Sequence, residues 1–405
     1  MENRGTPITE LLSFMVDNRG KTVPTAESGF PLIATNCIKH NSIYPTFENV
    51  RYVDEKTKDS WFRAHPEPND IIFVNKGTPG RVCLVPDPVP FCFAQDMIGF
   101  RCDPEKIDYQ YLFAVLRSDY IQKKIENYHV GLVIPHFKKG DLKQLNIPRL
   151  ESRDAELAVG KLYLALSEKI ELNNRINAEL EAMAKTLYDY WFVQFDFPDD
   201  SPQGQGKPYK TSGGKMVYNP TLKREIPEGW SDGIIADVIG KVPQATKVLA
   251  KDFQDNGKVP VIDQSQSYIC GFTDDETATI KPESAHVIFG DHTRAVKLVN
   301  FDYARGADGT QVLVAKSDKI PGYLLYQIVS DIDLSSYGYA RHYKFLKESK
   351  CVIPRAEVSQ CYQNTVKHWH EKIRDNIFQN YELERLRDWL LPMLMNGQVT
   401  VGEAS

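Results

Sequence analysis

The chain has 405 residues, of which 42% are hydrophobic and 25% are charged, which suits a globular protein of two domains. Its apolar runs are shorter than the about 18 residues of a membrane helix, and its N-terminus lacks a signal-peptide pattern, which excludes membrane and secreted classes. The seven cysteines form no C-x-x-C pair. This spacing argues against a zinc ribbon or a disulfide framework and favours a reducing cytoplasm.

The net charge of −5 is distributed unevenly along the chain. Residues 1–150 and 201–355 carry net charges of +1 and +2, whereas residues 151–200 and 356–405 carry −6 and −2. Net charge reports on solubility and electrostatic steering rather than on fold. Nucleic-acid binding is therefore not excluded.

Residues 1–150 are expected to form a mixed α+β domain. The runs 71–77, 81–86 and 91–100 have the alternating or continuous apolar pattern of strands and lie between Gly and Pro residues. Apolar spacings of three and four predict a helix from Tyr109 to Tyr128.

A long acidic helix is predicted over residues 155–192, which contain no Pro. Its length is about 57 Å at about 1.5 Å per residue, far longer than an average helix. Apolar residues recur in one heptad frame that only Lys169 and Asn173 interrupt. These residues are Val159, Leu162, Leu166, Ile176, Leu180, Met183, Leu187 and Tyr190.

Residues 198–229 hold five Pro and five Gly and are predicted to be a linker, packed in places by Tyr209, Tyr218 and Trp230. Residues 230–355 then repeat the mixed pattern. Strands are expected at 259–263, 286–291, 295–301 and 310–316, and a helix from Tyr323 to Ile332.

A second acidic helix is predicted from about Ala356 to Met395, with Gly397 as its C-cap. A shift of 203 positions lays the first long helix on the second, so that Asn173 falls on Asn376. The sequence thus contains two long helices of related sequence.

The duplication extends upstream of the helices. A shift of 206 lays His136-Phe137-Lys138 on His342-Tyr343-Lys344 and Ile147-Pro148 on Ile353-Pro354. The unit of basic domain, Ile-Pro junction and long helix therefore occurs twice. We predict an α+β chain with pseudo-two-fold symmetry, in which two mixed domains, each with a twisted sheet, are separated by two long antiparallel coiled-coil helices.

Sequence motifs of common catalytic centres are missing. The sequence has no Gly-rich nucleotide motif, H-E-x-x-H motif, paired Cys/His set or G-x-S-x-G elbow. Asn219-Pro220-Thr221 lacks the second Pro and the aromatic residue of an adenine-methyltransferase motif, and no E-x-K follows Asp87 or Asp96 to complete a nuclease metal site. We therefore predict no catalytic residue and no metal site.

Two Gly-containing loops that follow strands carry basic and hydroxyl side chains. Arginine donates bidentately to guanine and hydroxyls suit other base edges, so both loops are candidates for base readout. The alternative is that both are ordinary solvated turns. The candidate residues are Lys76, Thr78 and Arg81 in one loop and His292, Thr293 and Arg294 in the other.

The duplicated His-aromatic-Lys stretches place several cations beside an aromatic residue, which favours phosphate contacts. The alternative is a charged surface turn beside the Ile-Pro junction. The candidate phosphate-binding residues are His136, Lys138, Lys139, Arg341, His342 and Lys344.

Two further sets of residues lie on the long helices. Asn173 and Asn376 are predicted to fix the helix register, because a polar residue in a coiled-coil core specifies alignment at a cost in stability; the alternative is that both are exposed. Trp191, Phe192 and Trp389 are predicted anchors for a partner protein. The alternative for these aromatics is that they close the core between the helices.

Several stretches resemble type I restriction–modification specificity subunits, in the order of that family and over nearly the whole chain. Residues 170–198 (IELNNRINAELEAMAKTLYDYWFVQFDFP) resemble the family's central conserved helix, and residues 381–401 (YELERLRDWLLPMLMNGQVTV) its C-terminal conserved helix. REIPEGW at 224–230 resembles the junction that opens its second target-recognition domain. The stretches that resemble target-recognition domains are 71–86, 131–148 and 286–315.

The resemblance implies a DNA-recognition subunit that is not an enzyme and binds no cofactor. It implies that two target-recognition domains read the halves of a bipartite, asymmetric double-stranded DNA target. Two methylation subunits, which carry S-adenosylmethionine, would dock on the chain, and restriction subunits that use ATP and Mg²⁺ would join through them. The implied divisions are 1–150 and 230–355 for the recognition domains, 151–197 and 356–405 for the helices, and 198–229 for the linker.

Two alternatives remain open. A duplicated coiled-coil scaffold whose α+β domains bind proteins would explain the helices but not the cationic loops at matched positions. Salt-dependent binding to random duplex DNA would separate it from a DNA-binding subunit. A single-chain restriction–methylation enzyme would need the motifs that the sequence lacks.

Overall fold

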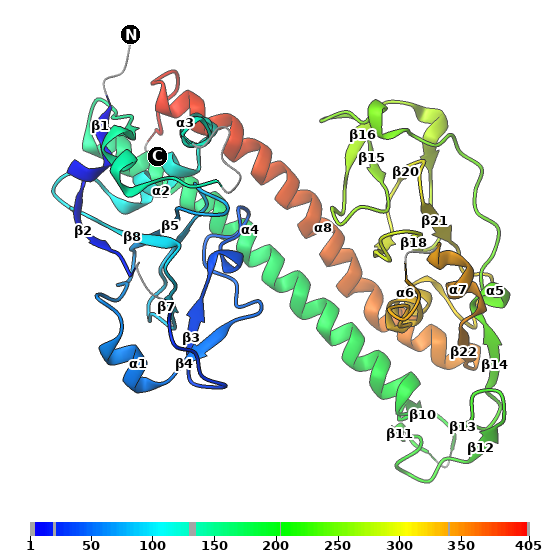
Figure 1. The fold of residues 1–405 in the computed structure, drawn as a ribbon. Coiled ribbons are helices and arrows are strands. Elements are labelled where there is room, and N and C mark those ends of the chain that lie inside the picture. The colour runs from blue at the N-terminus through cyan, green and yellow to red at the C-terminus, as the bar shows by residue number, and fades with distance from the viewer. Residues whose placement is uncertain (1–4, 19–21, 129–134, 203, 339–340, 403–405) are drawn as a thin grey trace. The chain divides into compact units, whose positions relative to one another are not determined.

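The structure is a computed structural model that describes residues 5–18, 22–128, 135–202, 204–338 and 341–402. It divides into two compact units, which are considered separately (Figure 1). Unit 1 comprises residues 1–175 and 377–405, and unit 2 comprises residues 176–376. Each unit contains one mixed domain and one part of each long helix, so the predicted α+β fold is confirmed.

Unit 1 is built around strand β5 (Ile71–Val74), whose side chains are all buried. Ile71 and Phe73 face a core that β5 shares with helices, and Ile72 and Val74 face the core of a second sheet. This alternation follows from the two-residue period of a strand, here with both faces covered. The strand therefore reads as a continuous apolar run.

The strands of unit 1 form two sheets and one short pair. The antiparallel four-stranded sheet has the order β2-β8-β5-β6, the second sheet has the order β4-β3-β7, and β1 pairs with β9. The bounds of these strands are β1 Thr6–Pro7, β2 Leu12–Val16, β3 Phe30–Ile33, β4 Arg51–Val53, β6 Val82–Leu84, β7 Cys92–Phe93, β8 Met97–Cys102 and β9 Asn146–Ile147. The predicted strand 91–100 is thus two strands in different sheets.

The short helices of unit 1 are α1 (Glu55–Ser60), α2 (Tyr109–Arg117) and α3 (Asp119–Asn127). The single helix predicted from Tyr109 to Tyr128 is wrong, because the chain is extended at Ser118 and starts again. The Ser118 hydroxyl accepts a hydrogen bond from the Ile121 amide, as an N-cap does. The apolar spacing continues across the break, which explains the misreading.

Unit 2 has the same kind of central strand. In β18 (His286–Gly290), Val287 and Phe289 face the core shared with helices, while Ile288 faces a second core. The sheets have the orders β19-β18-β21 and β16-β15-β20-β17, with β14 paired to β22. The bounds of these strands are β14 Ser231–Ile234, β15 Val259–Ile262, β16 Gly271–Thr273, β17 Thr279–Ile280, β19 Val296–Val299, β20 Tyr303–Arg305, β21 Thr310–Leu313 and β22 Lys350–Ile353.

The short helices of unit 2 are α5 (Ile235–Val238), α6 (Gly322–Asp331) and α7 (His342–Glu348). The strands predicted in this region are confirmed as β15, β18, β19 and β21, and the predicted helix is α6. The predicted strands are longer than the observed ones by one to three residues, whereas the predicted helix has the length of α6 and lies one residue later.

Residues 198–229 contain two short hairpins, β10 (Pro198–Asp199) with β11 (Lys207–Pro208) and β12 (Met216–Asn219) with β13 (Arg224–Pro227). Phe197 stacks on Tyr209 and Trp230, with ring centroids 4.7 and 5.1 Å apart. Tyr209 and Trp230 are therefore packed as predicted. The prediction for Tyr218 is wrong, since its side chain is 62% exposed.

The long helices are α4 (Arg153–Tyr188), followed by a π-helical turn at Asp189–Val193, and α8 (Ala356–Met395). In unit 1, Val159 of α4 shares a core with Leu394 of α8, and Asn173 donates a hydrogen bond to Asn380. In unit 2, Tyr362 donates to the carbonyl of Ala184, and Asn376 donates to Asn177. Within each unit the two helices therefore run antiparallel, as predicted.

The predicted apolar stripe of α4 is half wrong. The heptad position that Val159 and Asn173 occupy faces α8, as predicted. The second buried position lies one residue later than predicted, since Ala184 is fully buried whereas Met183 is 49% exposed. The contact between Ala184 and Tyr362 explains the shift, because a small residue lets the helices approach and an aromatic residue fills the space. No helix among the described residues combines the length and apolar composition needed to cross a membrane.

Candidate nucleic-acid interface

In unit 1, the loop after β5 is joined to the duplicated His-aromatic-Lys stretch. Asn75, the first residue after β5, is 2% exposed and accepts a hydrogen bond at its carbonyl from the Phe137 amide (2.8 Å). The Asn75 side-chain nitrogen lies 3.4 Å from Nε2 of His136. The Gly77 amide donates to the carbonyl of Pro135 (2.9 Å). Residues 75–81 and 135–139 therefore form one surface, called here the unit 1 patch.

In unit 2, the loop after β18 is joined in the same way. Asp291, the first residue after β18, is 6% exposed. Its carbonyl accepts a hydrogen bond from the His342 amide (2.9 Å), and its carboxylate accepts one from the Tyr343 amide (2.9 Å). Residues 290–294 and 341–344 form the unit 2 patch.

The sequence predicted the loops and the duplicated stretches as separate features. The structure brings them together twice, through the residue that follows the buried central strand. Sequence reasoning missed Asn75 and Asp291 as the joining residues. Their signal is a polar residue directly after a fully apolar strand, where burial requires that backbone and side-chain polar groups find partners.

The unit 1 patch exposes Lys76 and Lys138. Arg81 is half-buried, and its guanidinium lies 3.5 Å from the carbonyl of Ile38, at the limit of a hydrogen bond. Thr78 and His136 are also half-buried. The cations that face solvent in this patch are therefore mainly lysines.

One predicted cation of the unit 1 patch is paired within the protein. Lys139 is half-buried, and its ammonium lies 3.0 Å from the carboxylate of Asp17. This ion pair joins the duplicated stretch to Asp17, the residue that follows β2. Lys139 is therefore less available to a phosphate than the exposed Lys138.

The unit 2 patch exposes His292, Arg294, Arg341 and Lys344. Arg294 has a left-handed backbone (φ 60°) at the turn of the loop, and its guanidinium donates to the carbonyl of Leu334 (3.3 Å). A cavity of about 480 Å³ lies beside this loop. It is lined by His292, Arg294, Ser335, Tyr337, Gly338, Arg341 and His342.

Two predicted contact residues of unit 2 are engaged inside the protein. His342 is 5% exposed, and its ring nitrogens lie 3.0 Å from the carbonyls of Asp291 and Tyr337. The Thr293 hydroxyl donates to the carbonyl of Gln264 (2.5 Å) and accepts from the Ala295 amide (3.2 Å). The burial of His342 contradicts its predicted phosphate contact, whereas Thr293 is exposed and its predicted base contact stays a prediction.

Comparison with known proteins bears on the whole chain. Residues 14–182, which include the unit 1 patch and most of α4, match the family described as the type I restriction modification DNA specificity domain. The chain carries a type I DNA specificity domain. This match confirms, for residues 14–182, the resemblance noted in the sequence.

Two curated relatives and one solved structure extend the match beyond this specificity domain. The MjaIX specificity subunit of Methanocaldococcus jannaschii is 22% identical over 87% of this chain and 83% of its own length. The HindI specificity subunit of Haemophilus influenzae is 23% identical over 63% of this chain and 69% of its own length. A crystal structure of a type I restriction-modification S subunit from M. genitalium shares the fold, with a TM-score of 0.59 at 15% identity over 96% of this chain and 94% of that one.

The two register asparagines lie at the helix contacts of the units. Asn173 of the specificity domain is fully buried and donates to Asn380 (2.8 Å), and Asn376 donates to Asn177 (2.8 Å). A shift of 203 relates these two pairs. The side-chain oxygen Oδ1 of Asn173 has no hydrogen-bond partner among the described residues, which is a cost in stability that a register role would explain.

The predicted partner anchors divide into two groups. Trp191 and Phe192 are 6% and 5% exposed, and their rings contact Tyr362 with centroids 6.0 and 5.3 Å apart. They close the core between the helices, which was the alternative. Trp389 is 60% exposed and stays a candidate anchor. Within the described ranges, no group of three His, Cys, Asp or Glu side chains is arranged to hold a metal ion.

Proposed function

We propose that the chain is the DNA-recognition subunit of a type I restriction–modification complex. In this proposal the unit 1 patch and the unit 2 patch each read one half of a bipartite, asymmetric target in double-stranded DNA. The observation that carries the proposal is a repeated arrangement: the loop after a buried strand, called here the tip loop (residues 75–81 in unit 1 and 290–294 in unit 2), is joined to a His-aromatic-Lys stretch. The family match to a DNA specificity domain covers residues 14–182, which include the unit 1 patch, and the duplication extends the argument to unit 2.

Each patch offers two kinds of group to DNA. Arg81 and Arg294 lie at the ends of the tip loops, where a planar guanidinium could donate bidentately to a guanine edge in the major groove. Lys138 and Lys344 are exposed point charges that suit phosphates, which fix orientation without reading sequence. The tip loops would therefore supply specificity and the duplicated stretches would supply general affinity.

The long helices would dock two methylation subunits. Met183 in unit 2 and Leu386 in unit 1 are 49% and 44% exposed, and a shift of 203 relates them. An exposed apolar residue repeated at matched positions suits two copies of one partner. Trp389, also exposed, would add a large anchor on α8.

The chemistry of the complex would belong to the partners. The methylation subunits would carry S-adenosylmethionine, and restriction subunits that use ATP and Mg²⁺ would join through them. This chain would bind no cofactor and catalyse no step. An enzyme that modifies a base flips it into a dedicated pocket, and in this proposal the methylation subunit supplies that pocket. All seven cysteines lie within the described residues as free thiols, which suits the reducing cytoplasm.

A second candidate function is a scaffold that binds only proteins. The exposed Met183, Leu386 and Trp389 favour it. It gives no reason for exposed cations on tip loops that are built alike in both units. The two functions differ in what they predict for DNA.

The test is binding of the full chain, with its methylation partner, to random duplex DNA at several salt concentrations. A recognition subunit binds with log K falling linearly as log salt rises, because phosphate neutralisation releases counterions. Methylation sequencing of a strain that expresses both proteins should then yield one motif of two separated halves. Binding that is undetectable at low salt would favour the scaffold.

A further inference from the structure

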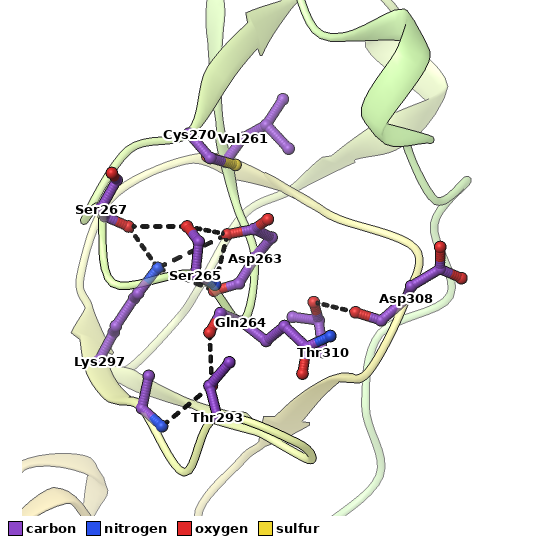
Figure 2. Close-up of polar contacts among 11 residues, drawn as sticks. Val261, Asp263, Gln264, Ser265, Ser267, Cys270, Thr293, Lys297, Asp308 and Thr310 are labelled. Carbon is purple, nitrogen blue, oxygen red and sulfur yellow. Dashed lines mark hydrogen bonds and ion pairs between the residues drawn. The ribbon is translucent and has the colours of Figure 1, made fainter. Parts of the chain in front are cut away.

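A buried lysine lies behind the tip loop of the unit 2 patch. Lys297 of β19 is 6% exposed, and its ammonium donates to the carbonyls of Asp263 (2.8 Å) and Ser267 (2.5 Å), as Figure 2 shows. The Asp263 carboxylate is 3.8 Å away. Burial lowers the pKa of Lys297, which reflects the cost of taking an ammonium group out of water. The two hydrogen bonds and the nearby carboxylate offset part of this cost.

What Lys297 holds is loop 263–267, which follows β15. The loop is closed internally as well, because the Asp263 carboxylate accepts hydrogen bonds from the amide (2.8 Å) and the hydroxyl (2.5 Å) of Ser265. Lys297 ties the first and last residues of this turn to the neighbouring sheet. Gln264 lies within this turn, directly after Asp263 (Figure 2).

Gln264 in turn contacts the tip loop. Its side-chain oxygen accepts a hydrogen bond from the His292 amide (3.2 Å), and its carbonyl accepts the Thr293 hydroxyl (2.5 Å). The packing around Gln264 is tight: a Cβ added at Gly309 would lie 2.4 Å from its side-chain nitrogen, and one at Gly290 would lie 3.1 Å from its Cβ. A displaced Gln264 would thus displace the backbone that carries His292 and Arg294.

We infer that Lys297 is a positioning residue for sequence recognition by unit 2, acting through Gln264 on the orientation of the tip loop. The inference rests on the proposed function of the unit 2 patch as a DNA reader. Lys297 itself is buried and would not touch DNA. It therefore sets specificity without supplying the electrostatic part of affinity.

The test uses the full chain with its methylation partner on duplexes randomised at both half-sites. The half-site that unit 2 reads is the one whose base preference Arg294→Ala changes. Lys297→Met keeps an unbranched side chain of nearly the same length but removes the ammonium group. It should lower discrimination at that half-site about tenfold and leave the other half-site unchanged. Affinity for random duplex and its salt slope should stay at the wild-type value, because no phosphate contact is lost.

A second variant tests the route through Gln264. Gln264→Ala, which removes the contact to the His292 amide, should lower discrimination at the same half-site by a similar factor. Adding Lys297→Met to it should have little further effect, because two residues that act through one contact are not additive. Should Lys297→Met fail to fold, Gln264→Ala alone decides, with discrimination at that half-site as the readout.

The matched control is Lys316→Met in the same unit. Lys316 also donates to a backbone carbonyl, that of Asp237 (3.1 Å), but it contacts α5 and not loop 263–267. It should keep wild-type discrimination. Wild-type discrimination in the Lys297 and Gln264 variants, a uniform loss at both half-sites, or additive losses would overturn the inference. A wild-type complex that reads no motif would instead overturn the proposed function, and the inference with it.

Discussion

The two units solve one structural problem with different residues. In both, the residue after the central strand joins the tip loop to the duplicated stretch. The unit 1 loop is further held by Gln122 of α3, which donates to the carbonyl of Gly80 (2.9 Å), whereas the unit 2 loop is held by Gln264 from a neighbouring loop. Because the two domains share one fold but hold their tip loops with different residues, they can present two different surfaces. This is what a reader of an asymmetric target requires.

The junctions between domain and helix differ in the same manner. A shift of 203 relates Gly160 of α4 to Gln363 of α8. In unit 1, a Cβ at position 160 would lie 2.5 Å from the Tyr111 amide nitrogen, so only glycine fits. In unit 2, the Gln363 side chain accepts a hydrogen bond from the Tyr323 amide (3.2 Å). Close backbone approach and a side-chain bridge thus replace each other at matched positions.

The two units should differ most in how their stability depends on pH, and this is the largest effect that we expect. His370 of α8 stacks on Tyr323 with ring centroids 5.0 Å apart, and burial lowers the pKa of His370 to about 4. The matched residue in unit 1 is Ser167, which does not titrate. Between pH 6.5 and 4 the unfolded chain binds a proton that folded His370 does not, so stability is lost as pH falls. The loss should reach about 2 kcal/mol at pH 5, at 1.36 kcal/mol per pH unit.

Urea denaturation of the full chain at pH 7 and pH 5 measures this loss. His370→Phe preserves the stacking surface without a titrating group and should remove about 2 kcal/mol of the pH dependence. An equal pH dependence in wild type and His370→Phe would contradict the stated role of burial. Ser167→Ala is the matched control in unit 1 and should leave the pH dependence unchanged.

The next effect concerns the helix junction of unit 1. Gly160→Ala places a methyl group against the backbone of α2 and should destabilise the chain by about 1–3 kcal/mol, as overpacking does. The same substitution at Gly140, around which a Cβ would meet nothing within 4 Å, should change stability little. Thermal denaturation followed by circular dichroism measures both. A neutral Gly160→Ala would mean that α2 and α4 separate without cost.

The smallest effect is electrostatic. Lys138→Ala and Lys344→Ala should each weaken binding to all duplexes alike and reduce the salt slope by about 1, because each removes one phosphate contact. Lys161, exposed on α4, is the control and should have no effect when changed to alanine. Mobility shifts at several salt concentrations measure the slopes. A base-specific loss from Lys138→Ala would break the division between phosphate contact and base readout.

The elements that sequence predicted well are those whose pattern is local. The apolar runs of β5 and β18 and the shared sequence of α4 and α8 needed no knowledge of neighbours. Half of the stripe of α4 was placed one residue too early, because hydrophobicity ranks Met183 above Ala184, while helix approach favours the smaller residue.

The candidate interface was predicted less completely for a related reason. The tip loops were located by their composition, but the engagement of Thr293 depends on Gln264, which lies 29 residues earlier in the chain. Likewise His342 is buried by the carbonyls of Asp291 and Tyr337. Contacts between loops have no periodicity, so they cannot be predicted from residue spacing in the sequence.

The central claim is that each patch reads its own half of the target. Methylation sequencing of strains that express Arg81→Ala or Arg294→Ala with the methylation partner tests it directly. Each variant should relax the motif at one position in one half, with a loss of about 1–3 kcal/mol in discrimination, and the two variants should affect opposite halves. Both variants relaxing the same half, or weakening methylation equally at every site without changing the motif, would contradict the claim.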